Sequence, residues 1–313
     1  MHFFNYFKKT LFFLVLLSHL ISEGQKDSLK NIHIAHKKRE TAVYTSIGIT
    51  YTTLAYGLYN AWYKNYPTTQ FHFFNDNDEW LQMDKVGHAY SCNAEAIAGI
   101  QLMEYLGLSE KKSLWTGGLI GFGMQTMVEI MDGFSSKWGF SWGDMSANVV
   151  GTSITMLQHH YWKEQRIKLC YSFHKTEFST LRPEVLGHTF LTRTLKDYNG
   201  QTAWLSLNLS SWFPKRSIPA WVNIDIGYGA YGMITGNPNE NNNFVFNGNS
   251  FNYSSIVRYR KFFLSPDINL QKIPYIKKRP KLLAIAHLLS PLKVPLPALQ
   301  FDKFGVKFNS FYF

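Results

Sequence analysis

The sequence predicts an α+β fold in which an N-terminal apolar helical bundle is followed by an antiparallel β-sheet. Two observations carry this prediction. Residues 40–164 contain long apolar stretches separated by turn residues, as expected for packed helices. Residues 165–313 instead contain several runs that alternate apolar and polar side chains, which is typical of strands. Because the two kinds of element are segregated along the chain, we expect a helical domain over 40–164 and a β region over 165–313.

The first 24 residues have the pattern of a secretory signal peptide. Lys8 and Lys9 precede an apolar run over residues 11–21, and small residues follow it. We expect cleavage near residues 24 and 25, and a polar linker over 25–39. An uncleaved membrane anchor is the alternative, although the apolar run is short for a span. No Cys stands at the end of the run, so acylation is not expected. Export predicts a location in the cell envelope, either the periplasm or the outer membrane.

The composition narrows the range of partners. Aromatic residues make up 17% of the chain and its net charge is +11. Aromatic abundance suits strands, a bilayer interface or a plain core. A basic chain favours anionic partners, and for an exported protein these are membrane lipid or lipopolysaccharide rather than nucleic acid. Other envelope proteins are the remaining class of partner.

Four long helices are expected in the first half of the chain. The first, which Pro67 follows, is long enough to cross a bilayer or to fill a core. Four glycines in the third permit close approach of a neighbouring helix. Asp144 is placed to cap the fourth. The expected ranges are 40–63, 80–108, 113–131 and 144–162.

The second half is expected to hold strands, an Asn-rich surface loop over 237–252 and a short helix over 281–289. Cys92 falls in a helix and Cys170 in a strand, and the sequence leaves open whether they pair. The expected strands are 168–173, 204–209, 221–226, 257–269 and 304–313.

The strongest indication of function is a set of polar pairs in the apolar helices. Residues three or four apart share one face of a helix, so each pair projects from one side. Ionisable groups in such helices are expected to meet one another or a ligand. The three pairs are Asp84 with His88, Glu129 with Asp132, and Asp144 with Asn148.

Two interpretations of these pairs are open. Carboxylates and His from facing helices build metal sites in helical bundles, and they suit Zn²⁺, Mn²⁺ or Fe²⁺. Alternatively, Lys85 pairs with a carboxylate, Asp144 caps its helix, and the others form structural hydrogen bonds. A divalent metal would be held by Asp84, His88, Glu129 and Asp132; catalysis would use these four and Asp144; Lys85 and Asn148 would bind a ligand.

Two family resemblances involve these residues. The spacing of Asp84-Lys85-x-x-His88, Glu129 and Asp144-x-x-x-Asn148 resembles the VanZ-like family of small membrane proteins. That resemblance implies a shared helical polar site and no particular reaction.

A second resemblance covers more of the chain. The segments VEIMDGFSSKWGFSWGDMSANVVGT, LRPEVLG and LKDYNGQTAWLS resemble an uncharacterised family described as predicted periplasmic lipoproteins (YfiM-like), in its longer Bacteroidota-type form. The resemblance extends from about Asp84 to Phe313, implies an envelope location and brings no established activity. The missing lipobox Cys departs from the family description.

The β half is expected to contact a membrane or a partner. Aromatic alternation and the terminal Phe313 are typical of outer-membrane barrels, but too few strands are expected for closure, which needs about eight. A small sheet packed on the helices is therefore favoured over a complete barrel. Two functions remain: a non-catalytic envelope protein that binds lipid or a partner, or an envelope enzyme that acts on lipid or cell-wall material.

Overall fold

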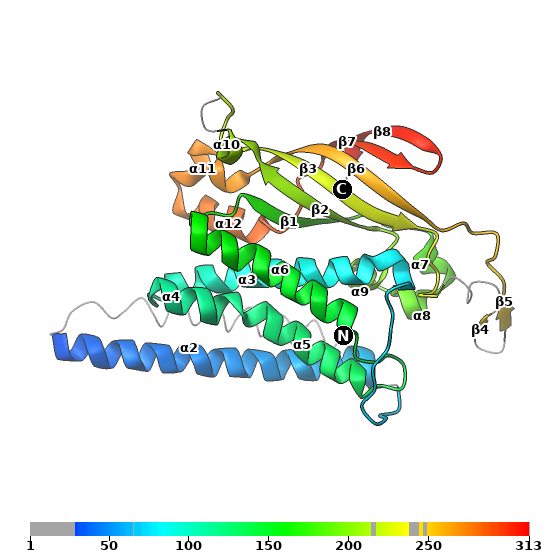
Figure 1. Ribbon diagram of the computed structural model, residues 1–313, viewed down its shortest axis with the longest axis horizontal. Helices are drawn as coiled ribbons and strands as arrows, with labels where there is room; N and C mark the ends of the chain where they lie inside the picture. The colour runs from blue at the N-terminus through cyan, green and yellow to red at the C-terminus, as the bar shows by residue number, and fades with distance from the viewer. Residues whose placement is uncertain (1–28, 65, 214–216, 238–243, 247–248, 313) are drawn as a thin grey trace.

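The computed structural model of the protein describes residues 29–64, 66–213, 217–237, 244–246 and 249–312 (Figure 1). A twisted sheet lies over helices α3 and α6, and α2 runs along the far side of the helical layer (Figure 1). The predicted α+β class, with a helical half before an antiparallel sheet, is confirmed. The expected signal peptide and Phe313 lie outside the described residues.

The helical half contains the four expected helices. The first begins inside the segment that was expected to be a polar linker. Residues 29–47 hold neither Gly nor Pro, so nothing in them stops a helix. No helix of the described residues combines the length and the apolar character needed to cross a membrane. The helices are α2 (Leu29–Leu58, continued by η1, Tyr59–Tyr63), α3 (Met83–Tyr105), α5 (Ile120–Gly133, preceded by α4, Glu110–Lys112, and η3, Ser113–Gly117) and α6 (Trp142–Trp162).

The starts of α3 and α6 also differ from the sequence-based expectation. Helix α3 begins at Met83 rather than Trp80, because Trp80, Leu81 and Gln82 have positive φ angles that no α-helix accepts. Helix α6 is capped by Ser141, whose hydroxyl accepts a hydrogen bond from the backbone N–H of Asp144 at 3.1 Å. The expectation that Asp144 is the cap was therefore wrong. Its side chain is left available for other contacts.

Glycines allow the helices to approach closely. A Cβ added to Gly151 of α6 would lie 2.1 Å from the carbonyl oxygen of Ala89 in α3. A Cβ on Gly117 would lie 2.4 Å from the carbonyl oxygen of Gly99. Backbones in such contact leave no room for a side chain. The predicted role of the glycines in helix packing is thus confirmed at Gly117.

The second half forms one six-stranded antiparallel sheet in the order β1-β2-β3-β6-β7-β8, with a separate hairpin of β4 and β5. Strand β7 was not expected, because Pro295 before it and Pro297 within it are typical of a loop. The short helix expected at 281–289 is α12. The elements are β1 (Ile167–Phe173), β2 (Gln201–Asn208), β3 (Val222–Tyr231), β4 (Phe244–Phe246), β5 (Asn249–Phe251), β6 (Tyr259–Ile268), β7 (Leu296–Asp302) and β8 (Gly305–Tyr312), with α7 (Phe178–Leu181), α8 (Pro183–Leu186), α9 (Phe190–Lys196), α10 (Leu209–Trp212), α11 (Pro274–Lys277) and α12 (Pro280–Leu289) between them.

The buried face of the sheet combines an apolar cluster around Trp204 and Phe263 with many polar side chains, and the opposite face exposes apolar side chains. On the buried face, Lys293 lies 3.1 Å from Asp267 and 3.7 Å from Asp225. The opposite face carries a row of exposed apolar side chains that pair directly across four strands. This row is Ile226, Leu264, Leu299 and Phe308.

The two cysteines are free thiols. Cys92 is buried in α3 and Cys170 in β1, within separate parts of the core. The sequence left open whether Cys92 and Cys170 pair, and in the structure they do not form a disulfide.

The contact between α3 and α6 can be tested at Gly151. Gly151→Ala should destabilise the protein by about 1–3 kcal/mol, because the added methyl group forces the two backbones apart. Thermal unfolding of the purified chain measures this. Gly48→Ala in α2 is the matched control, since nothing lies within 4 Å of its added Cβ. Equal unfolding temperatures for both variants would contradict the close contact.

Candidate functional site

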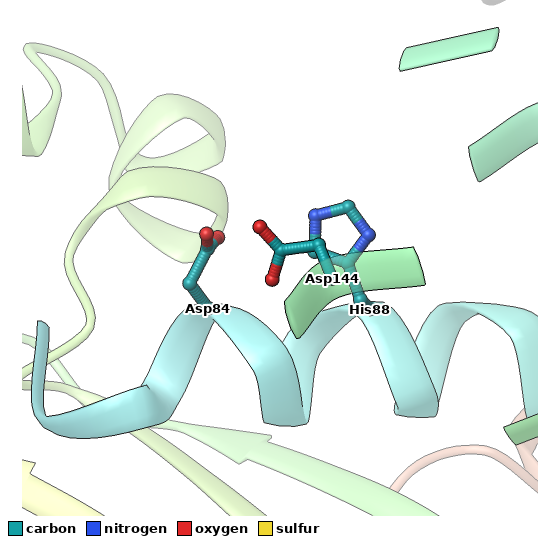
Figure 2. A group of neighbouring side chains, drawn as sticks. All are labelled: Asp84, His88 and Asp144. Atoms are coloured by element: carbon teal, nitrogen blue, oxygen red, sulfur yellow. The ribbon is translucent and has the colours of Figure 1, made fainter. Parts of the chain in front are cut away.

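The first turns of α3 and α6 bring together three of the expected site residues. Asp84 and His88 project from one face of α3, and Asp144 projects toward them from α6. One ligand atom from each residue lies within 4.8 Å of the other two. Figure 2 shows the two carboxylates facing each other beside the imidazole ring. Two carboxylates and one His, supplied by two helices, are a donor set that suits a divalent cation.

The imidazole of His88 is oriented by its neighbours. Its Nδ1 lies 3.0 Å from Oδ1 of Asn148, one turn beyond Asp144 on α6. An N–H at Nδ1 donates to this amide oxygen and leaves Nε2 as the basic nitrogen. Nε2 lies 3.4 Å from Oε1 of Glu129, which comes from α5. The expected partners Asn148 and Glu129 therefore both border the site.

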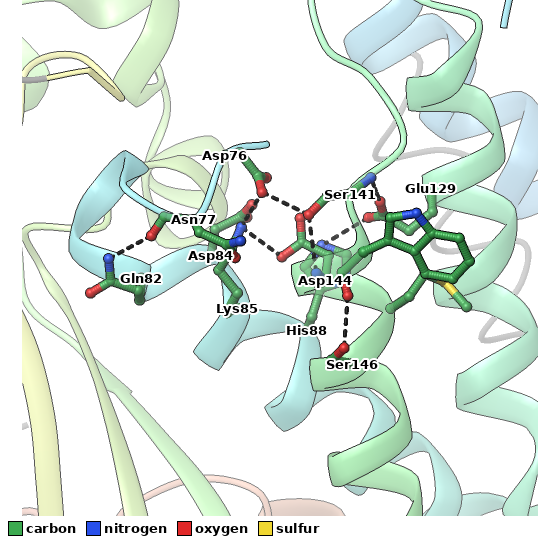
Figure 3. A network of polar contacts seen from close by, with 12 residues as sticks. Asp76, Asn77, Gln82, Asp84, Lys85, His88, Glu129, Ser141, Asp144 and Ser146 are labelled. Atoms are coloured by element: carbon green, nitrogen blue, oxygen red, sulfur yellow. Dashed lines mark hydrogen bonds and ion pairs between the residues drawn. The ribbon is translucent and has the colours of Figure 1, made fainter. Parts of the chain in front are cut away.

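A Lys links the site to the loop before α3. Nζ of Lys85 lies 2.6 Å from Oδ1 of Asp76 and 3.1 Å from Oδ1 of Asp144. The hydroxyl of Ser141 donates to the same Asp76 oxygen at 2.6 Å, and its backbone N–H donates to Oε2 of Glu129 at 2.9 Å. Figure 3 shows this network, which joins the loop before α3 to helices α3, α5 and α6. The expected pairing of Lys85 with a carboxylate is thus found together with the convergence of Asp84, His88 and Asp144.

Asp132 does not join the three-residue group. It accepts a hydrogen bond at 2.8 Å from the hydroxyl of Tyr63, at the end of the first helix. On the opposite side, the hydroxyl of Tyr198 donates to Oδ1 of Asp84 at 2.5 Å. Tyr198 precedes β2 and is the contribution of the β half to the site.

Four residues of the network were not expected from the sequence, namely Asp76, Ser141, Tyr63 and Tyr198. Asp76 stands in the polar run Asn75–Asp78, which resembles an ordinary surface loop. Ser141 had a detectable signal, because a Ser three residues before an acidic residue is a common helix start. The two tyrosines reach the site only through the tertiary fold.

Acidic groups outnumber basic groups here, and the pKa values reflect this. Burial, strengthened by nearby carboxylates, raises the pKa of Glu129 and of Asp132 to about 8. Burial and the charge of Asp84 raise the pKa of Asp144 to about 7. Although burial disfavours the imidazolium, the carboxylates of Asp84 and Asp144 raise the pKa of His88 above its usual value. The site therefore needs protons or a cation to balance its charge.

The comparison with known families concerns the same part of the chain. Residues 72–160 match the model of a family described as predicted periplasmic lipoprotein (DUF2279). This confirms the resemblance to predicted periplasmic lipoproteins within residues 72–160, whereas the segments LRPEVLG and LKDYNGQTAWLS lie outside the match. The family description is consistent with a cell-envelope location.

The matched segment contains Asp76, Lys85, Glu129 and the three-residue group, whereas Tyr63 and Tyr198 lie outside it. The weaker likeness to the VanZ-like family is not supported. No curated protein and no solved structure matches the chain.

The raised acidic pKa values predict how stability depends on pH without added metal. A carboxyl group with a raised pKa in the fold stabilises it at low pH, and this contribution is lost as pH rises through the folded value. For Asp132 the loss should run between its ordinary 3.8 and about 8. We therefore expect the urea midpoint in chelator to fall over this range.

Asp132→Asn should flatten this pH profile, because the amide imitates the protonated acid and still accepts from Tyr63. The control is Glu110→Gln, whose exposed carboxylate pairs with Lys163 at the surface. A profile for Asp132→Asn as steep as that of the wild type would contradict the assignment.

Proposed function

We propose that this chain is an exported cell-envelope protein whose helical half binds a divalent metal at Asp84, His88 and Asp144. The observation that carries the proposal is their convergence, with one ligand atom each within 4.8 Å of the others. Zn²⁺ holds its ligands at about 2.0–2.2 Å, so a small inward shift of the side chains would complete coordination. The periplasm or outer membrane is the proposed location, in keeping with the family description.

The surroundings support a metal centre. Asn148 holds Nδ1 of His88 and so fixes the orientation of the ring, as a hydrogen-bond partner usually does around a metal-binding His. Tyr198 orients Asp84 through a 2.5 Å hydrogen bond. A bound cation would supply the positive charge that these carboxylates lack, and it would displace the proton that Asp144 keeps because its pKa is raised.

The chemistry that fits such a centre is metal-assisted hydrolysis on lipid or cell-wall material. A divalent metal polarises a substrate oxygen and lowers the pKa of a bound water. Glu129 lies 3.4 Å from His88, and its pKa of about 8 lets it accept or give up a proton near neutral pH. The backbone N–H of Ser141 fixes the other oxygen of Glu129 in place.

Metal analysis tests the proposal. The purified wild-type chain should carry stoichiometric transition metal, and His88→Ala should lose it. His159→Ala is the matched control, because His159 is also half-buried and lies 3.2 Å from Glu104. It should keep the metal. Asn148→Ala should bind metal about 10–100-fold more weakly, because the ring of His88 is no longer oriented. Metal in neither the wild type nor the control would refute the centre.

A second candidate is a purely structural network, favoured by the position of Lys85 between Asp76 and Asp144. The variant Lys85→Met distinguishes a structural network from a metal centre. A structural network predicts a loss of about 3–5 kcal/mol in unfolding free energy, because the carboxylates are left without a cation, and added metal would not restore it. A metal centre predicts instead that the variant binds metal more tightly, because a competing cation is gone. Metal titration followed by thermal unfolding distinguishes the two outcomes.

A further inference from the structure

Helix α12 carries an exposed apolar stripe. Ile285 and Leu288 are 52% and 76% exposed, and Leu282 and Leu289 lie beside them at helical spacing. The helix packs on the protein through Ala286, which is buried. Figure 1 places α11 and α12 at one end of the sheet, near the end of α6. The stripe faces away from the fold and is not needed for its core.

A basic turn directly precedes the stripe. Lys277, Lys278, Arg279 and Lys281 are all exposed. No Asp or Glu occurs from residue 268 to residue 301. No ion pair joins these four to a carboxylate in the part of the chain that the structure describes. The guanidinium of Arg279 instead lies 3.5 Å from the ring centroid of the exposed Tyr275.

We propose that α12 and this basic turn bind the surface of an anionic phospholipid bilayer. An exposed apolar stripe beside clustered Lys and Arg is the pattern of a helix that lies in the membrane interface. The stripe supplies contact with acyl chains, and the basic turn supplies attraction to phosphate head groups. The positive charge of the basic turn argues for an anionic occupant, and the acyl chains of a bilayer would cover the exposed stripe beside it. This inference does not depend on the proposed metal centre.

Vesicle co-sedimentation of the full chain tests the proposal. The wild type should bind vesicles that contain both phosphatidylcholine and phosphatidylglycerol. It should bind much less to vesicles of phosphatidylcholine alone. Added salt should weaken the binding. Replacing Lys277, Lys278 and Arg279 together by Gln should reduce binding on the order of 100-fold, because each basic residue contributes about fivefold at an anionic surface. Ile285→Asn with Leu288→Asn should also weaken binding, but with the salt dependence retained.

Two controls keep the result specific. Lys111→Gln removes an exposed charge elsewhere, and Leu157→Asn changes an exposed apolar residue of α6. Both should bind as the wild type does, and circular dichroism should show every variant folded. Equal binding to both vesicle types would overturn the proposal, as would unchanged binding by the two α12 variants. Self-association that only the α12 variants abolish, without vesicle binding, would assign the stripe to a second copy instead.

Discussion

The contact between α3 and α6 is the constraint on which the rest of the molecule depends. Gly151 brings the two backbones together, and Asn93 then ties the pair to the sheet. The buried amide of Asn93 donates to the hydroxyl of Thr155 at 2.6 Å, while its oxygen accepts from the backbone N–H of Leu169 in β1 at 3.0 Å. One side chain thus fixes the two helices that carry the site and the first strand of the sheet.

This constraint explains why the site lies where it does. Asp84 and His88 precede Asn93 on α3, while Asp144 and Asn148 precede Gly151 on α6. Once the two helices are pinned at these later positions, their first turns are held face to face. A donor set assembled from two helices has a fixed geometry only when the helices themselves cannot slide. The packing of small residues therefore supports the chemistry of the charged ones.

Much of the fold could be predicted from the sequence, because helices and strands leave periodic patterns. The polar pairs of α3 and α6 were recognisable for the same reason. Tyr198 and Tyr63 were not, since hydroxyl groups far along the chain reach the site only after folding. Strand β7 was hidden by Pro295 and Pro297. Alternation also could not tell which face of the sheet is buried, because it reports two faces without saying which one meets the core.

The exposed apolar side chains of the sheet have a consequence for the chain in the period after its synthesis. An exposed apolar row crosses the sheet and ends on β8, an edge strand with unpaired backbone groups. The row consists of Ile226, Leu264, Leu299 and Phe308. A row of this kind next to an open edge promotes strand-to-strand aggregation in water. A newly synthesised chain would therefore need a chaperone, or rapid transfer to an apolar environment, to avoid association with other copies.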